Sequence, residues 1–228
     1  GALTSIGDPA AVEALFALLG TSDAAVRKAT VGALNVLGPP EMVERVIPLL
    51  DDPNPAVREA GVRIAGYFGY RRCVDAVFGL CRDEDENVRR AAIEHLPYLE
   101  DERTPKVLSE ALRREVPVVR AAAAGAMAQI EASAAVPYLV AALDDEDPWV
   151  RYFAARSLDR HRAPEAASAL HRLAQSDKFQ QVRIAAFEAL CRIDESLAAS
   201  VASAFSSSPN PDFRRAAALA LNNRNGTA

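Results

Sequence analysis

The chain has 228 residues, of which 50% are hydrophobic and 25% are charged, and its formal net charge is −5. Such a chain can bury a continuous core without a metal or a disulfide. Its acidic balance argues against a general nucleic-acid binder, which needs a basic stripe. The sequence contains no apolar run of the length of a membrane-spanning helix, and its odd number of cysteines (Cys73, Cys81 and Cys191) favours reduced thiols in a cytoplasmic protein.

A short pattern, a hydrophobic residue followed by arginine, recurs along the whole chain. These marker arginines are Arg27, Arg58, Arg89, Arg120, Arg151, Arg183 and Arg214. Successive markers are 31 residues apart, except for one interval of 32. A fixed period of this length is typical of stacked repeats, each of which is too small to bury its own apolar face.

Each period predicts two helices joined by a turn. In the third period, apolar residues at helical spacing over 73–80 are followed by an acidic run over 83–86 and a second apolar pattern over 88–99. We expect a single domain over 1–228, with residues 1–8 ending a preceding partial repeat, so that the chain is a fragment of a longer array. The successive repeats are predicted at 9–38, 39–69, 70–100, 101–131, 132–162, 163–194 and 195–228.

The start and the core positions of each second helix are also predicted. Prolines that suit a first helical turn lie two residues before four of the marker hydrophobes, at Pro55, Pro117, Pro148 and Pro211. Asp23, Asn54, Asp147 and Asn210, three residues before the marker hydrophobe, are predicted N-caps. The positions after each marker are mostly alanine, and the seventh holds a predicted core residue: Leu34, Leu96, Met127, Leu158, Leu190 or Leu221, with Ala65 as the exception beside Ile64.

The combined pattern Asp/Asn-Pro-x-Val-Arg-x-Ala-Ala-x-x-x-Leu resembles the HEAT-repeat family, in particular its short, phycobilisome-lyase-like form. The resemblance covers essentially the whole chain and implies an all-α, right-handed α-solenoid of about seven helix-turn-helix repeats. It also implies a structural ladder, in which an aspartate of the turn pairs with the marker arginine. The matching residues are Asp52 and Arg58, Asp83 and Arg89, Asp145 and Arg151, and Asp177 and Arg183, whereas Thr21, Arg114 and Ser208 depart from the pattern.

The resemblance further implies that the second helices line a concave binding face. The residues one, five, eight and nine positions past each marker are predicted to form the exposed ridge of the second helix. The ridge includes Lys28, Gly32 and Asn35, then Glu59, Arg63 and Tyr67, then Arg90, Glu94 and Tyr98, then Ala121, Gly125, Ala128 and Gln129, then Tyr152, Arg156, Asp159 and Arg160. The small residues of the fourth repeat predict a hollow between aromatic and arginine walls.

Tyrosine, tryptophan and arginine dominate protein-binding sites, so we predict a partner-binding set on this ridge. Its residues are Arg63, Tyr67, Tyr98, Trp149, Tyr152, Arg156 and Arg160. The structural alternatives are that Trp149 packs over a neighbouring turn and that the two tyrosines Tyr67 and Tyr98 only pack helix ends.

The predicted function is a non-enzymatic scaffold or adaptor that binds a protein or peptide segment, without a cofactor, nucleic acid or membrane. The alternative is a bilin lyase or isomerase, with a tetrapyrrole held by Arg63, Tyr152, Arg156 and Arg160; architectural self-assembly is a third possibility, and the oligomeric state is left open. The three histidines do not form the repeated His-Glu pairs of di-iron hydroxylases, and the acidic runs are too short for a calcium loop, so neither a metal nor a catalytic residue is predicted.

Overall fold

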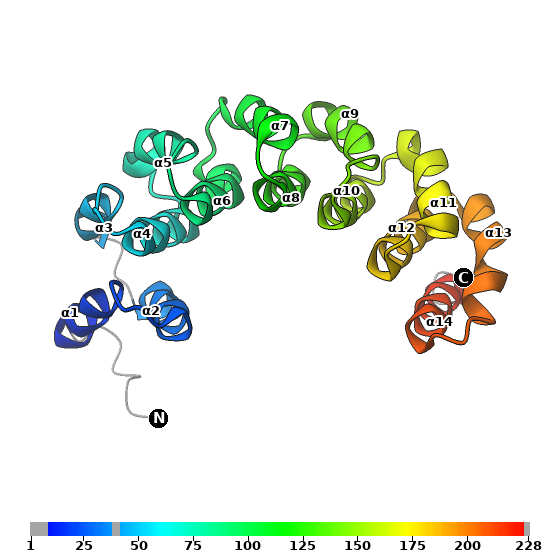
Figure 1. Cartoon of the computed structure of the whole chain (residues 1–228), viewed down its shortest axis with the longest axis horizontal. Coiled ribbons are helices and arrows are strands. Elements are labelled where there is room, and N and C mark those ends of the chain that lie inside the picture. The colour runs from blue at the N-terminus through cyan, green and yellow to red at the C-terminus, as the bar shows by residue number, and fades with distance from the viewer. Residues whose placement is uncertain (1–8, 38–41, 226–228) are drawn as a thin grey trace. The chain divides into compact units, whose positions relative to one another are not determined.

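The computed structural model describes residues 9–37 and 42–225, with side chains described between 11 and 218. Over this part, the chain forms fourteen α-helices and no strand (Figure 1). The first helices of successive pairs are α1 (Pro9–Leu18), α3 (Val43–Leu49), α5 (Val74–Leu80), α7 (Thr104–Arg114), α9 (Ala132–Ala142), α11 (Ala167–Ser176) and α13 (Glu195–Ser206). The second helices are α2 (Ala24–Leu37), α4 (Pro55–Phe68), α6 (Glu86–His95), α8 (Pro117–Ala126), α10 (Pro148–His161), α12 (Gln180–Ile193) and α14 (Pro211–Asn225). Short 3-10 segments flank several of them: η2 (Arg71–Cys73), η3 (Leu96–Leu99), η4 (Met127–Gln129) and η5 (Pro164–Ala166).

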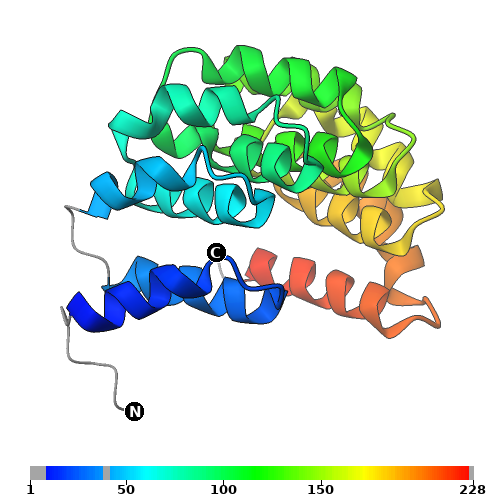
Figure 2. The ribbon, with the colours of Figure 1, turned by 60° about the vertical axis from the view of Figure 1, so that its left-hand side comes forward.

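The helices fall into two compact units. Unit 1 ends at Thr104 and holds α1 to α6, whereas unit 2 begins at Pro105 and holds α7 to α14. In unit 1, α2 packs on α4 and α4 packs on α6; in unit 2, the series α8, α10, α12 and α14 packs in the same way. Within each unit the second helices therefore form one layer and the first helices another (Figure 2). No described helix has both the length and the apolarity needed to cross a membrane.

The second helices begin where the sequence predicts. Proline is the first residue of α4, α8, α10 and α14, where its missing N–H leaves no intrahelical bond unmade. The Asn54 side chain accepts a hydrogen bond from the Ala56 N–H at 3.0 Å, and the Asp147 carboxylate accepts one from Trp149 at 2.8 Å. These caps fix the first turns of α4 and α10 against the preceding turns.

One recurrent position of the second helices and their 3-10 extensions contributes a large residue to the core in successive repeats. Leu34, Leu96, Met127, Leu158 and Leu190 are fully buried, and so are Ala65 and Ile64, which share this task in α4. The side chain of Leu221 lies outside the described residues. Close backbone approach adds to the packing, because a Cβ atom at Gly66 would lie 2.5 Å from the Cβ of His95 on α6. Only glycine is compatible with such a short separation between α4 and α6.

The ladder joins neighbouring repeats. Arg58 Nε and Nη2 each donate to the Asp83 carboxylate at 2.8 Å, while Arg58 Nη1 donates to the main-chain carbonyl of Asp52 at 2.9 Å. Arg120 with Asp145, and Arg151 with Asp177, form the same two-bond ion pair. The carboxylate of each pair thus comes from the following repeat. The aspartate six residues earlier offers its carbonyl to Arg58 and Arg151, whereas Arg120 donates to the Glu115 carbonyl. Bidentate geometry makes each pair a strong and directional link between repeats.

For two marker arginines, Arg89 and Arg183, the following repeat has no aspartate at the ladder position but Arg114 and Ser208. Arg89 Nη1 donates to the carbonyls of Asp83 and Glu84, as Arg58 and Arg151 do to carbonyls of their own turns. Arg183, whose next rung position is Ser208, has its guanidinium 4.6 Å from the ring centre of Phe213 and donates to the Ala174 carbonyl. Asp177 is therefore paired with Arg151 and not with Arg183.

Candidate partner-binding surfaces

The seven predicted partner-binding residues fall into one set in each unit. Arg63 and Tyr67 lie on α4 and Tyr98 lies in η3, all in unit 1. Trp149, Tyr152, Arg156 and Arg160 all lie on α10 in unit 2. Every one of them comes from a second helix or from its 3-10 extension. The hollow predicted around the fourth repeat stays a prediction.

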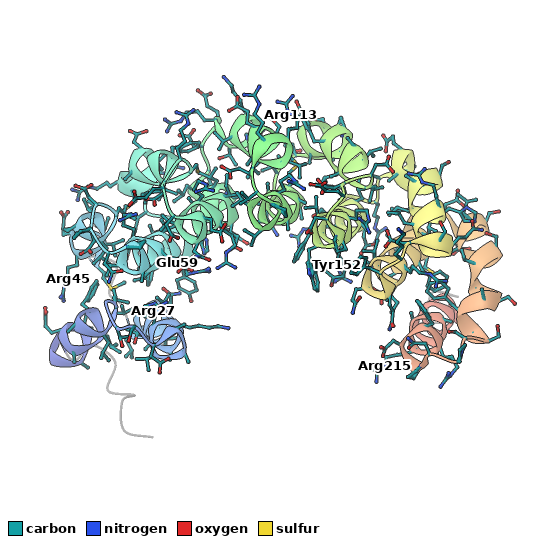
Figure 3. The ribbon with its side chains drawn as sticks, viewed as in Figure 1. Arg27, Arg45, Glu59, Arg113, Tyr152 and Arg215 are labelled. Carbon is teal, nitrogen blue, oxygen red and sulfur yellow. The ribbon has the colours of Figure 1, made fainter. Side chains whose placement is uncertain are left out.

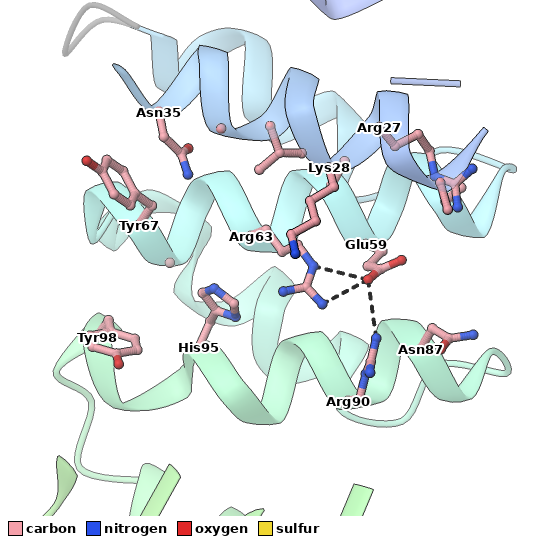
Figure 4. A pocket seen from close by; sticks show the side chains of 16 residues that line it. Arg27, Lys28, Asn35, Glu59, Arg63, Tyr67, Asn87, Arg90, His95 and Tyr98 are labelled. Carbon is pink, nitrogen blue, oxygen red and sulfur yellow. Dashed lines mark hydrogen bonds and ion pairs between the residues drawn. The ribbon is translucent and has the colours of Figure 1, made fainter. Parts of the chain in front are cut away.

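The set in unit 1 borders a groove of about 970 Å³ that α2, α4, α6 and η3 line together (Figure 4). We call it the unit 1 groove. Residues one, five, eight or nine positions past a marker arginine supply much of its lining, among them Lys28, Gly32, Asn35, Glu59, Arg63, Tyr67, Arg90 and Tyr98. The predicted ridge of the first three repeats is therefore brought together on one concave surface of unit 1.

Cations dominate the lining of this groove. The lining contains one carboxylate, that of Glu59, and four cationic side chains: Arg27, Lys28, Arg63 and Arg90. Glu59 Oε1 accepts hydrogen bonds from Arg63 Nε at 3.0 Å and Nη2 at 2.9 Å, and it lies 3.7 Å from Arg90 Nη2. The Glu94 carboxylate, which is not part of the lining, lies 3.5 Å from Arg63 Nη1 and 4.0 Å from Arg90 Nε. The four cations of the lining thus outnumber the two carboxylates that pair with them, within a chain of net charge −5.

A histidine forms part of the groove wall. His95 Nδ1 donates to the Ala91 carbonyl at 2.9 Å, and its ring packs against the backbone at Gly66. Burial lowers the pKa of His95, and the nearby positive charge of Arg63 lowers it further. His95 therefore adds a neutral, rigid surface at neutral pH and leaves the charge of the groove to its lysine and arginines.

Exposed apolar side chains mark the C-terminal ends of the same three second helices. Val36, Tyr67 and Tyr98, each nine residues past a marker arginine, are 79%, 61% and 51% exposed. The Tyr67 ring meets Phe68 edge-on at 5.1 Å, and the Tyr98 ring lies 6.2 Å from that of His95. Both tyrosines therefore have neighbours at the helix ends but keep about half of their surface free for contact.

The set in unit 2 is centred on three aromatic rings of α10. The rings of Trp149 and Tyr152 meet edge-on with centroids 5.7 Å apart, and Tyr152 meets Phe153 in the same way at 5.1 Å. Trp149 is 55% exposed and Phe153 is 38% exposed, so the tryptophan is not covered by a neighbouring turn. We call Trp149, Tyr152 and Phe153 the α10 aromatic cluster. Figure 3 shows Tyr152 on the second-helix side of unit 2, opposite Arg113 on the first-helix side.

Arginines extend this surface toward the C-terminal end of α10. Arg156 Nη1 donates to the Glu188 carboxylate at 3.0 Å, and Arg160 Nη2 donates to the Gln129 amide oxygen at 3.2 Å. Both side chains are exposed. Because exposed ion pairs are worth little, a partner carboxylate can replace these contacts at small cost.

Sequence reasoning missed Phe153. The position two residues past the marker arginine is alanine in the other repeats, as in Ala60, Ala91 and Ala185, and a phenylalanine there departs in size from the pattern. Gly125 on α8 makes room for it, since a Cβ atom at this glycine would lie 3.5 Å from the Phe153 ring. A large residue at a position that is otherwise alanine, together with a glycine in the preceding repeat, was the sequence signal that could have identified Phe153.

Metal-ligating and thiol groups do not converge in the described part of the chain. It holds no group of three or more His, Cys, Asp or Glu side chains placed to bind a metal ion. Cys73 and Cys81 are buried, Cys191 is half-buried, and burial raises the pKa of the Cys73 thiol. A raised pKa keeps that thiol protonated and inert as a nucleophile.

The repeated helix pairs, with their second helices in one layer, define an all-α repeat protein of the solenoid class. A family model described as HEAT repeats matches residues 43–128 and 104–191, which is more than half of the chain. The chain belongs to the HEAT-repeat family. No curated protein sequence matches it.

Solved structures show the same fold. The Escherichia coli protein YibA aligns with a TM-score of 0.72 and 24% identity, covering 90% of this chain and 79% of YibA. The complex of CpcE and CpcF of the phycocyanin lyase from Nostoc sp. PCC7120 aligns with a TM-score of 0.57 and 21% identity, covering 92% and 86%. An engineered protein aligns with a TM-score of 0.53 and 22% identity, covering 93% and 67%. These likenesses establish the helical repeat architecture of the chain.

Proposed function

We propose that the protein is a non-enzymatic scaffold whose second helices bind a segment of a partner protein. The observation that carries this proposal is the α10 aromatic cluster, whose tryptophan is more than half exposed with an arginine on the same helix face. Tryptophan, tyrosine and arginine are the residues that most often dominate binding energy at protein interfaces. Membership of the HEAT-repeat family supports the proposal, because HEAT repeats commonly mediate protein interactions.

The geometry of α10 suits contact with a partner chain. Trp149, Tyr152 and Arg156 follow one another at spacings of three and four residues, so they share one face of the helix. The edge-to-face ring contacts hold the aromatic side chains in place before a partner arrives, which reduces the entropy lost on binding. Arg156 adds a guanidinium that can exchange its exposed Glu188 partner for a carboxylate or carbonyl of the bound segment.

The triple variant Trp149→Ala, Tyr152→Ala and Arg156→Ala is expected to lose its partner in affinity capture from extracts of the native cell. Because hot-spot truncations cost about 2 kcal/mol or more each, binding should weaken by at least about tenfold. The matched control is the variant Tyr138→Ala and Arg172→Ala, which removes a tyrosine and an arginine from the first helices α9 and α11 of the same unit. Quantitative mass spectrometry of the captured proteins, with circular dichroism to verify folding, provides the comparison. A partner retained by the triple variant but lost from the control would place binding on the first helices.

The bilin-lyase alternative predicted from the sequence has only the fold in its favour. The residues predicted to hold a tetrapyrrole are Arg63 in unit 1 and Tyr152, Arg156 and Arg160 in unit 2. The likeness to CpcE and CpcF, at 21% identity, is one of architecture. Mixing the chain with a bilin separates the two functions: the scaffold leaves the visible spectrum of the bilin unchanged, whereas a lyase-like protein shifts its absorbance.

A further inference from the structure

We propose that the unit 1 groove binds an extended, acidic peptide segment of the partner. In this arrangement the segment places carboxylates against Lys28, Arg63 and Arg90 and an apolar side chain against Tyr67 and Tyr98. The inference rests on the proposed function and names the chemistry of the segment that the second helices of unit 1 bind.

Local charge favours an acidic ligand although the whole chain is acidic. Lys28, Arg63 and Arg90 line the groove together with Arg27, whereas Glu59 is its one lining carboxylate. Charges farther away than about 8 Å are largely screened at physiological ionic strength, so the lining, and not the net charge of −5, decides which ligand is attracted. A cationic concave wall also concentrates the field, which raises the local concentration of anions.

The groove already holds one carboxylate in the way expected for a ligand. Glu59 accepts two hydrogen bonds from Arg63 and lies between Arg63 and Arg90. Arg90 Nε is buried and has no hydrogen-bond partner within the described part of the chain, because the Glu94 carboxylate lies 4.0 Å away, too far for a hydrogen bond. A ligand carboxylate at hydrogen-bond distance would satisfy this donor. Figure 4 shows that Lys28 points from α2 toward Arg63. Among the described residues, no acidic group of this lining pairs with the Lys28 ammonium, so an acidic ligand would add a counter-charge beside it.

The repeat spacing defines the form of the ligand. Lys28 and Arg90 occupy the same register position, one residue past the marker, on α2 and α6. Arg63 lies on the intervening helix α4, one turn farther along, where Glu59 holds the equivalent position. Neighbouring packed helices are about 8–10 Å apart. An extended peptide rises about 3.3 Å per residue, so every third side chain meets the next helix, whereas three residues of an α-helix rise only about 4.5 Å. Acidic residues at every third position of an extended segment therefore match the three cations.

Two further features suit a peptide backbone and an apolar side chain. The side-chain oxygen of Asn35 is buried without a hydrogen-bond partner, and an N–H of a bound segment would satisfy it. Tyr67 and Tyr98, 61% and 51% exposed, lie on neighbouring second helices at one end of the groove, as Figure 4 shows. An apolar residue beyond the acidic positions would bury part of both rings.

The test uses a fluorescein-labelled peptide of ten residues, with glutamates at every third position, one leucine after the last glutamate and serines elsewhere. Fluorescence anisotropy of this probe with the full chain at low ionic strength should show saturable binding. The variant Lys28→Gln and Arg63→Gln should bind it about tenfold or more weakly, because each lost charged hydrogen-bond donor weakens binding by about tenfold. The matched control is Arg71→Gln and Arg72→Gln, which removes the same charge from exposed arginines outside the groove and should change binding less than about twofold.

Three results would overturn the proposal. The first is that a peptide with glutamine in place of every glutamate binds as tightly as the glutamate probe. The second is that the Arg71 and Arg72 control weakens probe binding as much as the Lys28 and Arg63 variant does. The third is that a single-stranded DNA oligonucleotide of the same charge binds more tightly than the probe. A peptide with the same composition but with adjacent glutamates should bind several-fold more weakly, and equal affinity would contradict the extended register. None of these measurements involves α10, so their failure is distinguishable from failure of the capture experiment with the α10 variant.

Discussion

Replacement of Asp83 by asparagine is expected to lower the free energy of unfolding by about 2–4 kcal/mol, because it leaves a nearly buried guanidinium without its counter-charge. The side chains of Arg58 and Asp83 are only 10% and 7% exposed, and their two hydrogen bonds join consecutive repeats. Asparagine can accept one of the two bonds but carries no charge. In a stack of repeats, loss of one junction weakens the cooperative unit on both sides of it.

The control for this variant is Glu84→Gln. Glu84 lies 3.8 Å from the same guanidinium but is 89% exposed, so its loss should change stability by less than about 0.5 kcal/mol. Urea unfolding of both variants, followed by circular dichroism, gives the two values. Equal destabilisation by Asp83→Asn and Glu84→Gln would show that general charge, and not the buried pair, stabilises the stack.

The effect of Asp83→Asn should also depend on pH. Burial raises the pKa of Asp83, but the Arg58 hydrogen bond and the Asp85 N–H outweigh it, and the pKa is lowered overall. A carboxyl with a lowered pKa in the folded state contributes stability above its ordinary pKa of about 3.9 and loses that contribution as the pH falls through the folded-state value. The difference between the wild-type chain and the variant should therefore be largest near pH 7 and should shrink below about pH 4.

Replacement of Gly66 by alanine is the second large effect, with an expected loss of about 2–3 kcal/mol. The added Cβ would lie 2.5 Å from both Cβ and Cδ2 of His95, so α4 and α6 must move apart or the imidazole must leave its place. Movement of the ring would also break its hydrogen bond to the Ala91 carbonyl. Because His95 lines the unit 1 groove, binding of the acidic probe should weaken as well.

Gly32→Ala is the matched control for that change. Gly32 is in α2, lines the same groove, and has open space where its Cβ would lie. Alanine should therefore stabilise the helix by about 0.5–1 kcal/mol through its better helix propensity. Thermal and urea unfolding of the two variants should give changes of opposite sign. An unchanged stability of Gly66→Ala would contradict the close approach of α4 and α6.

Sequence periodicity predicts the helix pairs, but it cannot predict which repeat supplies the partner of each ladder arginine. With a period of 31 residues, the position 25 residues after one marker is also the position six residues before the next marker. The Arg58 and Asp83 pair spans 25 residues, and the Arg151 and Asp177 pair spans 26 because the interval there is one residue longer. Only the packing of neighbouring turns in space distinguishes the two choices.

The binding surfaces were predictable in part. Helical geometry placed Arg63, Tyr67 and Tyr98 on one face, because the angular step of an α-helix fixes which residues share a side. The exposure of Trp149 was not predictable, since it depends on whether the adjacent turn covers the ring. The ion pairs of Arg63 with Glu59 and of Arg156 with Glu188 were also beyond the sequence, because long side chains have several acceptors within reach.

The two units carry opposite patterns along their second helices. In unit 1, Lys28 and Arg90 lie near the helix starts, and Tyr67 and Tyr98 lie at the helix ends. On α10 of unit 2 the order is reversed, because the aromatic cluster lies in the first turns and Arg160 in the last. Repeats of the same type therefore present different side chains in the two units. We expect the two surfaces to contact different parts of a partner.

Hydroxyl-radical footprinting of the chain with and without its captured partner shows whether the second helices form the binding face. Trp149 and Tyr152 report on the second-helix face, and Tyr138, which is 37% exposed on the first helix α9, is the internal reference. We expect the partner to lower the oxidation rates of Trp149 and Tyr152 severalfold and to leave that of Tyr138 unchanged. Protection of Tyr138 with unchanged oxidation of Trp149 and Tyr152 would contradict this expectation.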